Sequence, residues 1–129
     1  HFIVIPSKLS RSDVTETTQT LKWHANLKRR AADPAAVPPS RVMLSAVPVR
    51  RNEAEETAYM HIMTTMPTLT EPVMQRAAYV RMDLEGMLGA IRDNLVNKAN
   101  AKHMDVAITE MESVLGAIDE IIKKGQADG

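Results

Sequence analysis

The hydrophobic pattern opens with a short, unbroken apolar run at residues 2–5. A continuous run of this kind predicts a strand that is covered on both faces, as in a parallel sheet. We expect Pro6 to end the strand, because proline has no N–H to give to a strand ladder. A second run, within residues 41–45, predicts another buried strand, which should end before Pro48.

The segment between these two runs has helical spacing. The spacing predicts a helix that begins near Ser12, with Ser10 or Ser12 as its cap and cations at residues 28–30 in its last turn. Residues 33–39 are rich in proline and should form a connector. Strand, helix and strand joined by a connection this long form one βαβ unit, so the two strands should be parallel.

The next segment predicts a helix capped by Asn52, ended by Pro67, and followed by a short extended piece at Leu69. Three glutamates at the start of this helix suit its dipole, and we interpret them as helix-terminal charge rather than as an acid/base pair; they are Glu53, Glu55 and Glu56.

Helical signals continue to the end of the chain. Residues 70–72 resemble a helix start with proline in the first turn, and this helix should end near Gly86. Residues 87–95 support another short helix, whereas residues 97–102 are weakly specified.

The last segment has the clearest periodicity. Its apolar residues repeat in a 3-4-3 pattern that predicts a long amphipathic helix ending at Gly125: Met104, Ala107, Ile108, Met111, Val114, Leu115, Ile118, Ile121 and Ile122. Such a stripe needs a covering surface. We expect it to pack on a sheet face, with a coiled-coil dimer seam as the alternative.

Composition and charge narrow the class of protein. The 129 residues suffice for one domain, residues 1–129, with 44% hydrophobic residues, 3% aromatic residues and no cysteine. Formal net charge is zero, yet residues 1–51 carry 9 − 3 = +6 and residues 52–129 carry 7 − 13 = −6. No apolar run approaches the roughly 20 residues that cross a bilayer. We therefore expect a reduced, cytoplasmic protein without a membrane partner.

Because the chain begins with His1 directly before an apolar run, we also expect it to be a piece of a longer protein.

Signals for catalysis and metal binding are absent from the printed sequence. No glycine-rich turn joins a strand to a helix, so the chain has no phosphate-cradling loop of its own. The four histidines lack metal-ligand spacing, and no serine lies in a Gly-x-Ser-x-Gly setting. We therefore predict neither catalytic residues nor a metal site in this chain.

Two features remain as candidate binding sites. The loops after the two predicted strands, residues 6–10 and 46–50, should meet at the edge where ligands bind in open α/β sheets. Arg76 and Arg81 lie five residues apart, so spacing alone favours ion pairs with neighbours such as Glu71 or Glu85, or exposure to solvent.

Three stretches, in this order, resemble a known family: "FIVIPSKLSRSDVTET", "VMLSAVPVRR" and "PTLTEPVMQRAAYVRMDLEG". With the long terminal helix, they are similar to the carboxyl-terminal half of ParA/MinD-type deviant Walker ATPases. In detail they are similar to the ATPase encoded in the virulence region of T-DNA transfer systems. The resemblance implies a partial P-loop NTPase (Rossmann-like) α/β fold, forming the carboxyl-terminal portion of a larger ATPase domain.

The resemblance also implies roles for particular residues. The loops beside the nucleotide base correspond here to Pro6, Ser45, Val47, Pro48 and Arg50, although many relatives carry Asn at the position of Ser45. In such a parent protein ATP and Mg²⁺ would be cofactors, whereas this chain alone should bind neither and should not hydrolyse ATP.

Arg76 and Arg81 resemble family arginines that contact DNA without sequence preference. If they do not bind DNA, the basic first half around residues 28–30 and 50–51 becomes the better candidate. The implied partners are DNA, a second copy or the missing amino-terminal half, and a relaxase or partition complex. Two alternatives stay open: a non-enzymatic module that docks a protein through its terminal helix, and a metabolic P-loop relative.

Overall fold

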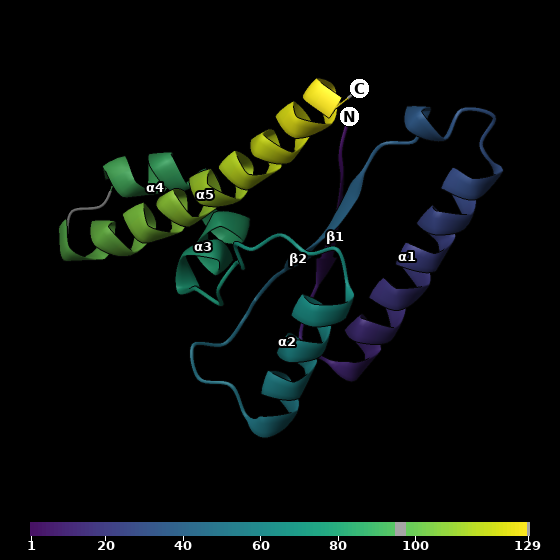
Figure 1. Ribbon diagram of the computed structural model, residues 1–129. Helices are drawn as coiled ribbons and strands as arrows, with labels where there is room; N and C mark the ends of the chain where they lie inside the picture. Colours follow the sequence, from purple (N-terminus) through teal and green to yellow (C-terminus); the bar gives the residue numbers. More distant parts are fainter. Residues whose placement is uncertain (95–97, 129) are drawn as a thin grey trace.

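The computed structural model describes residues 1–94 and 98–128, and it is an α/β structure built around a small parallel sheet (Figure 1). Strand β1 (Ile3–Ser7) pairs in parallel with β2 (Ser40–Leu44), and the register runs from Ile3 opposite Ser40 to Ser7 opposite Leu44. The predicted strand–helix–strand unit is confirmed.

Residues 67–75 form a third extended segment alongside β2. The backbone of Val42 accepts from Leu69 N and donates to Pro67 O, each at 2.8 Å, and Val73 N donates to Leu44 O at 2.8 Å. Two isolated bridges, at Thr68 and Met74, are parallel. The helix start predicted at residues 70–72 is therefore wrong, because these residues lie in the segment whose backbone is bonded to the sheet.

The prediction that Pro6 ends the first strand is also wrong. Ile3 N donates to Pro39 O at 2.9 Å, and Ser7 O accepts from Ser45 N at 2.9 Å, so the odd-numbered residues of β1 face β2. Because alternate residues of a strand point their polar groups to opposite sides, Pro6 faces away from β2. Its missing N–H costs the ladder nothing, and the strand continues to Ser7.

Helices α1 (Arg11–Arg30) and α2 (Glu53–Thr65) begin at the predicted caps. The Ser10 side chain accepts from Asp13 N, and Asn52 forms a capping box with Glu55. A short 3₁₀ helix, Pro34–Ala36, lies in the predicted connector.

The sheet is covered on both faces. On one face, α1 and α2 enclose a core of fully or nearly fully buried aliphatic side chains: Ile5, Leu9, Val42, Leu44, Val47 and Ile62. On the other face, Val114 of α5 (Lys98–Asp128) packs against Leu69 and Val73, with Phe2 and Met43 partly buried beside them. The expected sheet-face packing of the long helix is confirmed.

Two details of the terminal helix differ from the prediction. It continues through Gly125 to Asp128, because a single exposed glycine weakens a helix by only about 1 kcal/mol and does not stop it. Leu115, assigned to the apolar stripe, is exposed.

The first half of α5 covers two shorter helices, α3 (Ala77–Glu85) and α4 (Leu88–Asn94). Gly86 ends α3 as predicted. The predictions for residues 95 and 97 lie outside the described residues. Among the helices that the structure describes, none is long and apolar enough to span a bilayer.

Candidate functional site

The loops that follow β1 and β2 meet at the carboxyl edge of the sheet. Ser45 N donates to Ser7 O at 2.9 Å, and the Ser45 hydroxyl lies 3.5 Å from the same oxygen. Ser7 is buried, whereas Pro6 is exposed. The structure therefore places the end of β1, which contains Pro6 and Ser7 of the first predicted loop, beside Ser45, the residue before the second predicted loop.

The second loop begins with a strained residue. Ala46 has a φ of +50°, a left-handed conformation that non-glycine residues seldom adopt. The next residue holds this conformation in place. Val47 is fully buried, its backbone N–H donates to Val73 O, and its backbone carbonyl accepts from Gln75 N. Val47 thus supports the loop from within the core, while Pro48 is only half-buried. Residues with strained backbone conformations are often found at functional sites.

Two arginines follow this loop and have different surroundings. Arg50 is exposed, and within the described part of the chain its side chain makes no ion pair. Arg51 Nε donates to Glu56 Oε2 at 2.6 Å, and its guanidinium carbon lies 4.5 Å from the centre of the Tyr59 ring. The hydrogen bond to Glu56 raises the pKa of Arg51. Sequence reasoning missed the Arg51–Tyr59 stacking, which the capped start of α2 makes possible.

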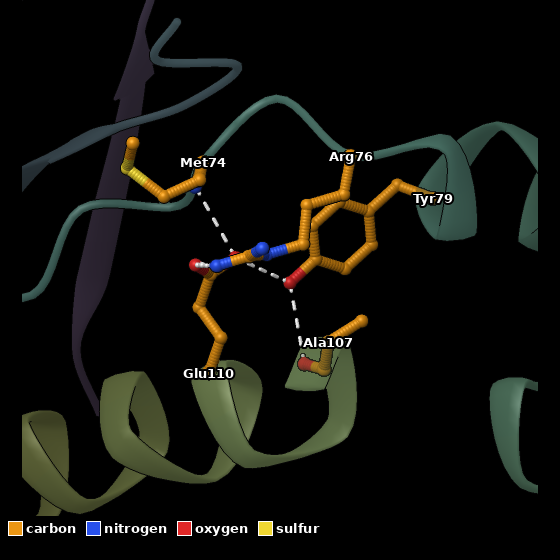
Figure 2. Close-up of polar contacts among 5 residues, drawn as sticks. All are labelled: Met74, Arg76, Tyr79, Ala107 and Glu110. Carbon is orange, nitrogen blue, oxygen red and sulfur yellow. Dashed lines mark hydrogen bonds and ion pairs between the residues drawn. The ribbon is translucent and has the colours of Figure 1, made fainter. Parts of the chain in front are cut away.

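The second candidate region centres on Glu110 of α5, whose carboxylate accepts from three residues (Figure 2). Arg76 donates to Oε2 through Nε at 3.2 Å and through Nη2 at 2.8 Å. Met74 N donates to Oε1 at 3.2 Å, and the Tyr79 hydroxyl donates to the same oxygen at 2.7 Å. The Tyr79 hydroxyl also lies 3.2 Å from Ala107 O. We call Met74, Arg76, Tyr79 and Glu110 the Glu110 cluster.

The protonation behaviour of the Glu110 cluster follows from this geometry. Burial alone would raise the pKa of Glu110, but hydrogen bonds from Arg76 and Tyr79 outweigh it and hold the pKa below its usual value. Burial, reinforced by the carboxylate beside it, raises the pKa of Tyr79. The cluster is therefore a charged pair with a neutral phenol at physiological pH.

Arg81 belongs to a different arrangement. It forms a two-pronged pair with Glu85 one helical turn away, at 3.0 and 2.7 Å, on the exposed side of α3. This is one of the carboxylates named from the sequence, and the pair lowers the pKa of Glu85. The partner of Arg76 could not be found by local spacing, because Glu110 lies 34 residues further along the chain.

Comparison with known proteins identifies one family. The family model described as "VirC1 protein" matches residues 1–124. Neither the comparison with curated proteins nor that with solved structures gives a significant match. The predicted similarity to a T-DNA transfer protein is confirmed at this level, and the wider ParA/MinD relationship stays a prediction. Since the match covers nearly the whole chain, the chain belongs to the VirC1 family of virulence-region proteins of T-DNA transfer systems.

Proposed function

We propose that, within T-DNA or plasmid transfer, this chain acts as part of a ParA-like ATPase and places the carboxyl edge of its sheet beside the nucleotide base. One observation carries this proposal. Ser45, which directly follows β2, is bonded to Ser7, the last residue of β1, at the edge where open α/β sheets bind ligands.

The residues of this edge have distinct roles in the proposal. Pro6, near the end of β1, and Pro48, in the loop after β2, have fixed backbone angles, and Ser45 offers a hydroxyl between these two segments. Arg50 is the exposed cation that reaches a bound nucleotide. Val47 contributes indirectly, because its buried side chain holds Ala46 in the left-handed conformation.

In the proposal, the residues of this chain contact only the base of ATP, and neither the phosphates nor Mg²⁺. The printed sequence has no glycine-rich turn between a strand and a helix, so these residues do not cradle phosphates. In the proposal, groups outside these 129 residues hold the phosphates and the metal ion. When bound, the metal ion would supply charge neutralisation during phosphoryl transfer, and this chain would orient the base.

DNA is the partner we propose for the second region. Arg76 and Arg81 neutralise backbone phosphates, which gives salt-sensitive binding with little sequence preference. A second copy of the protein, and a relaxase or partition complex, are further proposed partners. A module that only docks a protein through α5 is less well supported, since the middle of α5 is covered by the sheet.

The test measures ATP affinity and retention on random duplex DNA for three variants of the natural, full-length protein. Arg50→Ala should weaken ATP binding several-fold and leave salt-dependent DNA retention of the ATP-loaded protein intact. Arg76→Glu with Arg81→Glu should sharply lower DNA retention while ATP affinity survives.

Arg30→Ala is the matched control for the ATP measurement, because this arginine is also exposed but lies in the last turn of α1, at the other end of that helix from the carboxyl end of β1. Unchanged ATP affinity in Arg50→Ala would refute the nucleotide assignment. Unchanged retention and salt slope in the double variant would refute the DNA assignment and point to the basic first half.

A further inference from the structure

We propose that Glu110 is an intramolecular competitor for DNA at Arg76, so that the phosphate binds only when the carboxylate is displaced. This inference rests on the proposed DNA-binding role of Arg76. It adds a built-in restraint to that role, located at the contact between α5 and the segment that precedes α3.

The carboxylate occupies the edge of Arg76 that a phosphate would use. Nε and Nη2 of the guanidinium both point at Glu110 Oε2 (Figure 2), at 3.2 and 2.8 Å. Carboxylates and phosphates bind guanidinium in the same forked geometry, through the same pair of N–H groups. Glu110 and a phosphate therefore exclude each other at this edge.

Displacement of Arg76 leaves Glu110 with partners. Met74 N and the Tyr79 hydroxyl both donate to Oε1, the oxygen that Arg76 does not use. An isolated buried carboxylate would be costly, but this one keeps two hydrogen bonds when the arginine turns away. Helix α5 also keeps its apolar contacts, through Val114 on the sheet and Met104 on α4. The exchange thus needs no unfolding.

The approach to Arg76 is open on one side. The Arg76 side chain is 29% exposed and that of Glu110 only 11%, so an incoming anion meets the arginine before the glutamate. A concavity of about 210 Å³ adjoins Arg76, and Gln75, His103 and Val106 are among its lining residues. Among the residues that the structure describes, no carboxylate contributes to that lining. A phosphate can therefore reach the guanidinium without passing another negative charge.

The test compares DNA retention of Glu110→Gln with that of the wild-type, ATP-loaded, full-length protein on random duplex DNA. Removing the carboxylate charge should raise the affinity by about three- to tenfold, because a charge-assisted hydrogen bond no longer opposes the phosphate. Glu85→Gln is the matched control. It frees Arg81 from an exposed pair of little net strength, so retention should change by less than about twofold.

Two further variants separate competition from a general loosening of α5. In an Arg76→Gln background, Glu110→Gln should give no gain. Tyr79→Phe removes a hydrogen bond to Glu110 but leaves the ion pair, so retention should not rise. A gain that persists without Arg76, or an equal gain in Tyr79→Phe, would overturn the proposal.

The DNA contact at Arg76 and its restraint by Glu110 can be refuted separately. If Glu110→Gln gives no gain while Arg76→Glu lowers retention, the restraint is wrong and the DNA contact stands. If Arg76→Glu has no effect, the DNA contact itself is wrong.

Discussion

The parallel unit, residues 1–75, and the helical part, residues 77–128, are stabilised in different ways. In the parallel unit, side chains such as Val42, Leu44 and Ile62 are completely shielded from solvent. Both regions expose some large apolar side chains, such as Trp23 and Val49 in the parallel unit and Leu84 and Leu115 in the helical part. The first region has a layered core, whereas the second packs one apolar face, and the polar Glu110 cluster connects the two regions.

The difference bears on how each region can act. Hydrogen bonds from both neighbours fix β2, so the loops at its carboxyl edge are held as a rigid pair. The contact at Arg76 depends on side chains of two elements that can exchange partners. We infer that the sheet edge suits the binding of a small ligand of fixed shape, and that the helical part suits a contact that can be turned on and off.

The largest expected effect comes from breaking the layered core. Leu44→Ala deletes a fully buried side chain (0% exposed) and should lower the free energy of unfolding by about 2–5 kcal/mol. Leu84→Ala removes a side chain that is 77% exposed and should change it by less than about 0.5 kcal/mol. Urea unfolding of the full-length protein checks both. Equal losses would contradict the contrast between the buried core of the parallel unit and the exposed side of α3.

A smaller effect is expected at the Glu110 cluster, and it depends on pH. Glu110→Gln should cost about 1–2 kcal/mol of unfolding free energy at neutral pH, where the charged hydrogen bonds are complete. Because folding lowers the pKa of Glu110, this contribution is present above its unfolded pKa of about 4.3 and is lost as pH falls through the lower folded value.

Thermal unfolding of wild type and Glu110→Gln at several pH values tests this sign. The two proteins should differ at neutral pH, and the difference should shrink at an acidic pH below the lowered pKa of Glu110. A difference that is the same at both pH values would show that packing, rather than the charge of Glu110, gives the stability.

Local signals predicted much of the parallel unit. Ser10 and Asn52 are caps whose chemistry acts within three residues, so both helix starts follow from the sequence. The error at residues 70–72 has a tertiary cause. Proline suits the first turn of a helix, but here the backbone beside it is bonded to Val42, Leu44 and Val47 of the neighbouring segment. No pattern within residues 67–75 indicates that this segment pairs with residues 42–47.

The candidate sites show the same limit. Adjacent loops at the carboxyl edge follow from parallel pairing alone, and the structure has them. The partner of Arg81 lies one turn away and was among those considered, whereas Arg76 meets a residue 34 positions away. The sequence also did not predict that Val47 is buried and supports the loop after β2. Its place in the core depends on segments that meet only in the folded protein.

Effects of similar or smaller size are expected at two glycines of the helical part. Gly86 ends α3 with φ of +101°, which side chains rarely tolerate, so Gly86→Ala should destabilise the protein by about 1–2 kcal/mol at most. Gly116 lies inside α5, and an added Cβ would meet nothing within 4 Å. Gly116→Ala should therefore stabilise by about 0.5–1 kcal/mol. Thermal unfolding of the two variants should show shifts of opposite sign, and a loss of stability in Gly116→Ala would mean that α5 packs more tightly at this point than its exposure indicates.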